Sequence, residues 1–254
     1  MLAVRLMPCL LLRNAGLVKT IRFKDPSYVG DPVNAIRIFN EKEVDELILL
    51  DITATVERKR PQLKIIGEIA SECFMPLAYG GGIQSLDDIR EIFALGIEKV
   101  SINSHAIAHP EFITAAAHRF GSQSIVVSMD VKYSRWRGYR VHSHGGGKDT
   151  GLNPVEWAVR MEEAGAGEIL VNSIDRDGTM AGYDLDLIRQ ITGAVRIPVI
   201  ASGGAGKPED FGAAVRAGAS AVAAGSMVVY HGRNRAVLIN FPTRAEQERA
   251  FADS

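Results

Sequence analysis

A carboxylate inside a mostly apolar stretch is the first feature of this sequence that could do chemistry. Asp130 lies in "SIVVSMDV" (124–131), where a strand would point it inward. A carboxyl group held in such surroundings can act as a general acid or base. Its apparent counterpart in the first half of the chain is Leu11, in "PCLLLRNAG". Leucine exchanges no proton, so only one half retains a group for acid–base catalysis.

Two glycine-rich turns could hold phosphate groups. They are "GGGI" (80–83) and "SGGAG" (202–206). Glycines let backbone N–H groups approach an anion closely, and a helix N-terminus adds partial positive charge. The alternative is that the glycines only shape tight turns. The candidate ligands are Gly81, Gly82, Asn103 and Ser104 at one site, and Ser202, Gly203, Gly204, Gly225 and Ser226 at the other.

The stretch "NSIDRDGTMAGYD" (172–184) is the most polar of the predicted strand ends. Asp177, beside the turn-forming Gly178, is expected to face the ligand, whereas Asp175 is expected to pair with Arg176. Lys19 could neutralise a phosphate group or lie on the surface. We take Lys19 and Asp177, together with Asp130, as candidate catalytic residues and add Gly178 to the phosphate-binding set.

Eight short apolar runs alternate with helical patterns and would position these residues. Continuous rather than alternating apolar character is typical of parallel strands covered on both faces. Eight βα units over about 230 residues predict a (β/α)8 TIM barrel, an α/β fold whose sites lie at the carboxyl ends of the strands. The expected strands are 4–12, 46–52, 75–79, 98–103, 124–131, 167–174, 197–202 and 220–226.

An internal repeat supports the barrel. Residues 76–104 align without a gap to residues 198–226, which predicts two repeated half-barrels. We expect one TIM-barrel domain over 1–254, with half-barrels at about 1–122 and 123–242 and a C-terminal tail at 243–254.

Composition excludes several kinds of partner. The net charge is −1 and no apolar run approaches 18 residues, so we expect neither nucleic-acid nor membrane binding. Cys9 and Cys73 lack metal-ligand spacing and are expected to be reduced, in a cytoplasmic protein. His142 and His144 lack a third ligand, so no metal and no cofactor are expected. Their Gly-rich hairpin (133–151) is interpreted as a mobile lid, with Trp136 and Tyr139 as its packing residues.

The motifs resemble those of the HisF-type cyclase subunit of imidazole glycerol phosphate synthase over nearly all of residues 1–240. The matching stretches are "GLVKT", "LDITA", "GGGI", "KVSIN", "GAGEIL", "SIDRDGT" and "ASGGAGK". The resemblance implies an enzyme subunit that receives ammonia from a HisH-type glutaminase docked at the N-terminal barrel face. It also implies a phosphorylated small-molecule substrate and a pair of acid–base carboxylates, of which Asp130 is one. Position 11 should be the other, and it is Leu.

The resemblance further implies an ammonia gate made of four charged residues. All four are present: Arg5, Glu46, Lys99 and Glu168. Four charges at strand starts inside a barrel are costly unless they pair with one another. The alternative is a salt-bridge plug that stabilises the barrel and transports nothing.

A group of HisF-like paralogues is the more specific resemblance. "PCLLL", "ECFMPLAYGGG" and "HGRNRAVLINFP" (231–242) are similar to the paralogues that accompany acetamidino-group formation on surface-polysaccharide sugars, including lipopolysaccharide O-antigens. In these, the segment 231–242 is expected to replace the final barrel helix. The implied function is ammonia delivery to an ATP-dependent sugar amidotransferase. The alternatives are the cyclase (a lyase) of histidine biosynthesis and a non-catalytic scaffold that activates a glutaminase.

Overall fold

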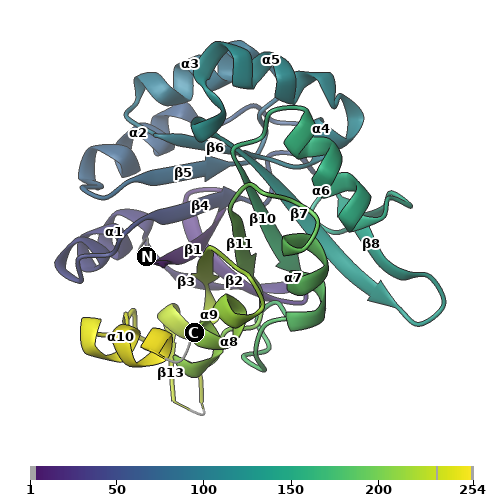
Figure 1. Ribbon diagram of the computed structural model, residues 1–254. Coiled ribbons are helices and arrows are strands. Elements are labelled where there is room, and N and C mark those ends of the chain that lie inside the picture. Colours follow the sequence, from purple (N-terminus) through teal and green to yellow (C-terminus); the bar gives the residue numbers. More distant parts are fainter. Residues whose placement is uncertain (1–3, 233, 253–254) are drawn as a thin grey trace.

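Eight parallel strands close into a barrel in the computed structural model, which describes residues 4–232 and 234–252. Each strand pairs with the next, and β12 returns to β1, so the barrel has no free edge. The TIM barrel predicted from the sequence is confirmed (Figure 1). Its strands are β1 (Arg5–Arg13), β4 (Leu47–Asp51), β5 (Leu77–Gly80), β6 (Lys99–Ile102), β7 (Ile125–Ser134), β10 (Glu168–Ser173), β11 (Val199–Ser202) and β12 (Ala221–Ala224).

Helices surround the barrel and cover the outer faces of its strands (Figure 1). None of those in the described part of the chain has the length and apolar character needed to cross a bilayer. The α-helices are α1 (Pro32–Glu41), α2 (Leu63–Glu72), α3 (Leu86–Ala94), α4 (Ser104–Ala108), α5 (Glu111–Phe120), α6 (Pro154–Glu163), α7 (Leu185–Thr192), α8 (Glu209–Arg216), α9 (Ser226–Val229) and α10 (Arg244–Ala252), with a 3-10 turn, η1, at Ser122–Ser124.

Local capping signals explain where several helices begin. The Asp31 side chain accepts from the backbone N–H of Asn34 at 2.9 Å and is followed by Pro32 at the first helical position. Ser85 and Asp88 form a reciprocal capping box at the start of α3. At α8, Pro208 is the N-cap residue and the helix begins at Glu209.

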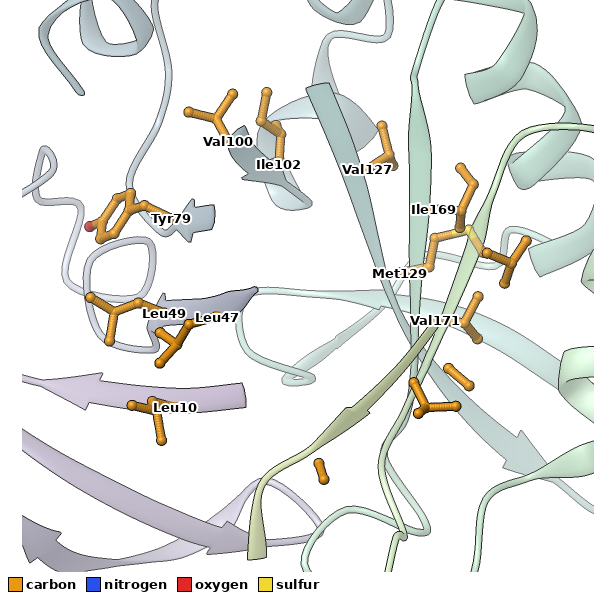
Figure 2. Packing of buried hydrophobic residues seen from close by; sticks show 14 of the residues in the cluster. Leu10, Leu47, Leu49, Tyr79, Val100, Ile102, Val127, Met129, Ile169 and Val171 are labelled. Atoms are coloured by element: carbon orange, nitrogen blue, oxygen red, sulfur yellow. The ribbon is translucent and has the colours of Figure 1, made fainter. Parts of the chain in front are cut away.

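Apolar side chains fill two layers, one on each side of the barrel wall. Side chains pointing outward from the strands pack under the helices; Leu10, Tyr79, Val127 and Ile169 are among them (Figure 2). The alternate positions point inward and form a smaller interior cluster of Met7, Cys9, Ile48, Ala78, Val126, Leu170, Ile200, Ala221 and Ala223. The period-two alternation of strand side chains therefore places one residue in each layer in turn.

Hairpins extend the chain beyond the barrel at three strand ends. The first follows β1 and consists of β2 (Gly16–Ile21) and β3 (Lys24–Gly30). The second extends β7 through β8 (Gly138–Ser143) and β9 (Lys148–Asp149). The third pairs β13 (Tyr230–His231) with β14 (Ala236–Val237). The sequence predicted only the second of these hairpins.

The C-terminal segment differs from the expectation. Residues 231–242 were expected to replace the last barrel helix, and 243–254 to form a tail. Instead, residues Arg244–Ala252 form α10, which lies against α8 through a Phe211–Phe251 contact with ring centroids 6.3 Å apart. The inserted segment delays the final helix rather than removing it.

Candidate active site

One cavity of about 520 Å³ opens at the carboxyl ends of the barrel strands. Residues from both halves of the chain, and from the segments that follow all eight barrel strands, reach it. Every residue that the sequence analysis proposed as catalytic or phosphate-binding lines this cavity, together with Leu11. The set is Leu11, Lys19, Gly81, Gly82, Asn103, Ser104, Asp130, Asp177, Gly178, Ser202, Gly203, Gly204, Gly225 and Ser226.

Leu11 and Asp130 approach the cavity from opposite sides. Leu11 lies on β1 and Asp130 on β7, the first and fifth strands of an eight-stranded barrel. Leu11 is buried beside Leu50, its partner in the register of β1 with β4. One wall of the cavity is therefore aliphatic where the facing wall carries a carboxyl group.

The surroundings of Asp130 bring its pKa close to neutral pH. Burial raises the pKa of Asp130 to about 7, and the negative charge of Asp177 adds to the rise. A hydrogen bond opposes it, since the Asn103 amide Nδ2 donates to the Asp130 carboxylate at 2.7 Å. A carboxyl group with this pKa can both give and take a proton at neutral pH.

Replacing Asp130 by Asn is expected to stabilise the fold at high pH only. The pKa of Asp130 is higher in the folded state than its ordinary 3.8, so ionisation costs stability as the pH rises from about 4 through 7. Asp130→Asn should raise the free energy of unfolding by about 1–2 kcal/mol at pH 8, and by nearly nothing at pH 4.

Urea unfolding at both pH values measures this difference. Asp25→Asn, an exposed carboxylate on β3, is the control and should show no such pH dependence. An Asp130→Asn effect of equal size at pH 4 and pH 8 would contradict the raised pKa.

A buried ion pair fixes the turn after β10 against the hairpin after β1. Lys19 Nζ lies 3.1 Å from Asp177 Oδ1, and both side chains are buried. The other oxygen, Asp177 Oδ2, accepts from the Thr20 hydroxyl at 2.7 Å and from the Phe23 backbone N–H at 3.3 Å. Lys19 is therefore not a surface lysine, and Asp177 faces the cavity as expected.

Asp175 does not have the partner that the sequence suggested. Its carboxylate accepts from the backbone N–H of Tyr133 at 2.8 Å, whereas Arg176 donates to the carbonyl of Ala181 at 3.3 Å. Adjacent residues in a tight turn point in different directions, so their opposite charges do not guarantee a contact.

The two glycine turns occupy equivalent positions in the two halves. Gly81 and Gly204 have φ values of +123° and +116°, which side chains rarely adopt. A Cβ atom at Gly81 would lie 2.5 Å from the Asp51 carbonyl, and one at Gly204 would lie 2.2 Å from the Gly182 carbonyl. Only glycine lets the chain turn this tightly at the rim of the cavity.

The serine that follows β6 and the corresponding serine that follows β12 have different surroundings. The Ser104 hydroxyl accepts from the backbone N–H of His144 at 2.9 Å. In the described part of the chain, the buried Ser226 hydroxyl has no hydrogen-bond partner although it lines the cavity. Buried polar groups are usually satisfied, so Ser226 is suited to a ligand.

The sequence analysis missed several polar residues of the cavity. Asp51, at the end of β4, accepts from the backbone N–H groups of Thr53 and Ala54 at 2.9 and 3.0 Å. Asn172 lines the cavity with a buried carbonyl oxygen that has no partner among the described residues. Arg58, His105 and His109 also line it. Asp51 and Asn172 lie near the carboxyl ends of predicted strands, and this position could have identified them as cavity residues.

The hairpin after β7 reaches the cavity only through the turn between β8 and β9. His144 and Gly145, between β8 and β9, line the cavity. Tyr139 packs as expected, with its ring centroid 5.1 Å from that of Tyr133. The expectation for Trp136 was wrong, because its side chain is 93% exposed at the turn between β7 and β8.

The four charged residues at the other end of the barrel form a closed ring. Arg5 bonds to Glu46 at 2.5 Å and to Glu168 at 2.9 Å. Lys99 bridges the same two carboxylates at 2.8 and 3.1 Å. Each charge in the ring lies between two opposite charges, which offsets the cost of removing it from water.

Metal-ligating side chains do not gather in the described part of the chain. No group of three His, Cys, Asp or Glu residues there is arranged to hold a metal ion. Cys9 and Cys73 are both free thiols. Burial raises the pKa of the Cys9 thiol to about 11, so it is protonated at neutral pH.

Comparison with known proteins gives one family over nearly the whole chain. The family model described as "Histidine biosynthesis protein" matches residues 5–234. A Pseudomonas aeruginosa protein named "Putative imidazole glycerol phosphate synthase subunit hisF2" is 54% identical over 94% of this chain and 95% of its own length. A Leptospira interrogans protein named "Putative imidazole glycerol phosphate synthase subunit HisF" is 46% identical over 99% of this chain and 100% of its own length. "Imidazole glycerol phosphate synthase subunit HisF" of Alkaliphilus metalliredigens is 46% identical over 91% of this chain and 92% of its own length.

Proposed function

This chain belongs to the HisF branch of the histidine biosynthesis protein family, and we propose that it is a synthase subunit that delivers ammonia for sugar amidination. In this proposal a HisH-type glutaminase releases ammonia at the N-terminal face of the barrel. The barrel conducts it to the open end. There, an ATP-dependent sugar amidotransferase uses it to form an acetamidino group on a polysaccharide sugar.

The aliphatic side chain of Leu11 is the observation that carries this proposal. Leu11 lies across the cavity from Asp130 and can neither donate nor accept a proton. In the cyclases that the chain resembles, both of these positions are expected to carry carboxylates. A barrel with only one of them is better suited to supply ammonia than to close an imidazole ring.

The retained features support ammonia passage. The ring of Arg5, Glu46, Lys99 and Glu168 lies at the strand starts, and the cavity lies at the strand ends. Between them the barrel interior is lined by the apolar cluster around Met7, Ile48 and Leu170. An apolar interior favours neutral ammonia over ammonium, because a charge is costly to remove from water.

Amidination needs only ammonia and an activated acceptor. The ammonia nitrogen attacks the carbon of an acetamido group whose oxygen has been activated by ATP. A C–N bond forms, the C–O bond to the activating phosphate group breaks, and nitrogen loses a proton. The activation belongs to the amidotransferase, so the barrel needs no paired acid and base for this reaction.

The glycine turns support a role for a phosphorylated ligand in the cavity. Gly81 and Gly82 with Ser104, and Gly203 and Gly204 with Ser226, line the cavity as two corresponding sets. The Lys19–Asp177 ion pair, which joins the hairpin after β1 to the turn after β10, lines the same cavity. The same residues favour the second candidate, the histidine-pathway cyclase, because that reaction uses a doubly phosphorylated substrate. The two candidates differ in whether the barrel itself performs acid–base chemistry, which ring closure by a cyclase needs and ammonia delivery does not.

Transfer of labelled nitrogen tests the proposal. The chain, its glutaminase and the ATP-dependent sugar amidotransferase are combined with glutamine that carries ¹⁵N in the amide, together with excess unlabelled ammonium. We expect ¹⁵N in the acetamidino product when this chain is present and unlabelled product when it is omitted. Unlabelled product in both reactions would contradict ammonia delivery by the barrel.

A further inference from the structure

One hairpin leaves the barrel wall and projects from the end at which the cavity opens. The pairing of β7 with β10 ends at Val131, whereas its pairing with β8 continues to Ser134, opposite Gly138. Figure 1 shows β7 and β8 extending past the surrounding helices. Residues 132–140, which we call the projecting hairpin, therefore lie outside the barrel sheet.

The base of the projecting hairpin is fixed to the barrel. The Tyr139 hydroxyl lies 2.8 Å from the Asp184 carboxylate, and the Tyr133 backbone N–H donates to Asp175 at 2.8 Å. Within the turn, Arg137 is ion-paired with Asp149 of β9 at 2.8 Å. A segment held in this way loses little conformational entropy when a partner binds to it.

The projecting hairpin combines exposed aromatic side chains with positive charge. Trp136 is 93% exposed and Tyr133 is 52% exposed. The projecting hairpin contains four basic residues and no acidic residue, in a chain whose net charge is −1. The basic residues are Lys132, Arg135, Arg137 and Arg140.

We infer that the projecting hairpin is the docking surface for the enzyme that consumes the ammonia, through an acidic face with an apolar pocket for Trp136. Trp, Tyr and Arg are the residues enriched at the energetic centres of protein interfaces. Positive charge on the hairpin selects a negatively charged partner surface and speeds encounter with it. This inference rests on the proposed function, which requires such an enzyme at the open end of the barrel.

The position of the hairpin fits this partner. The chain continues from the projecting hairpin into His144 and Gly145, which line the cavity. A protein bound to the hairpin would therefore stand over the cavity mouth, at the opposite end from the ion ring. A bilayer is a poorer fit, because interfacial binding requires a broad apolar face and the tip offers one exposed indole.

Binding of variants to the purified sugar amidotransferase tests the inference. Trp136→Ala and Arg135→Glu should each weaken the affinity of the full chain by about tenfold or more in biolayer interferometry. Arg244→Glu is the matched control, since it reverses the charge of another exposed arginine, on α10, and should leave the affinity unchanged. Vesicles containing phosphatidylglycerol and a single-stranded DNA are tested in parallel.

Unchanged affinity in both hairpin variants would overturn the inference. So would no binding by the wild-type chain, or retention on the vesicles or the DNA that depends on Trp136. The ¹⁵N transfer assay separates this failure from failure of the proposed function. If the wild-type chain transfers ¹⁵N and Trp136→Ala transfers it equally well, delivery stands and the docking surface is wrong. If the wild-type chain transfers none, the proposed function itself fails.

Discussion

The purified chain, given ammonium and the phosphoribulosyl intermediate of histidine biosynthesis, is expected to form the imidazole product at least about a hundredfold more slowly than a cyclase with both carboxylates. Removing one partner of an acid–base pair costs about 10²–10⁴ in rate, which corresponds to roughly 3–5 kcal/mol of transition-state stabilisation. Asp130 and the glycine cradles could still hold the substrate. One proton transfer would lack its group, because Leu11 and Leu50 line that side of the cavity.

The assay compares the unmodified chain with such a cyclase under matched conditions. Circular dichroism and thermal unfolding show that both proteins are folded. Rates within about tenfold of the control, a deficit of about 1.4 kcal/mol, would show that Leu11 is tolerated. That result would favour the histidine-pathway cyclase over ammonia delivery as the function of this chain.

Opening the ion ring is expected to separate glutamine hydrolysis from nitrogen transfer. Lys99 bridges Glu46 and Glu168, and Lys99→Ala leaves both carboxylates with Arg5 as their remaining partner in the ring. Ammonia would then escape at the N-terminal face rather than enter the barrel. We expect the share of glutamine ¹⁵N recovered in the acetamidino product to fall about tenfold, equivalent to about 1.4 kcal/mol.

The partner's glutamine hydrolysis, measured in the same reaction, should remain detectable. Lys64→Ala, which removes an exposed lysine on α2, is the control and should leave the recovery unchanged. A second variant, Lys99→Arg, keeps a positive charge between the two carboxylates and should restore part of the coupling. Equal recovery from Lys99→Ala and from the wild-type chain would leave a salt-bridge plug as the better interpretation of the ring.

Local sequence patterns were enough to predict the barrel and the positions of its strands. All eight expected strands are present with small shifts at their ends. Helices α1, α3 and α6 begin at the capping residues Asp31, Ser85 and Asn153, which are local signals of the same kind. Each of these features depends on residues within a few positions of one another. Propensity, apolar runs and capping therefore determine them without knowledge of the whole fold.

The internal repeat allowed part of the site to be predicted as well. Because the same glycines and serines recur 122 residues apart, and parallel barrel strands end at the same side, both turns had to reach one opening. The structure brings Gly81 and Gly203 to the rim of a single cavity. Asp51 and Asn172, which have no such repeated motif around them, were missed.

Side-chain partners were decided only by the tertiary structure. The pairing of Asp177 with Lys19 joins residues 158 positions apart, and the binding of Asp175 to the backbone of Tyr133 depends on how β7 extends beyond the barrel. The packing of α10 on α8 likewise follows from where the chain returns after the inserted hairpin. These contacts depend on strand register and on the closure of the barrel. A sequence states which charges are available, whereas register and closure determine which of them meet.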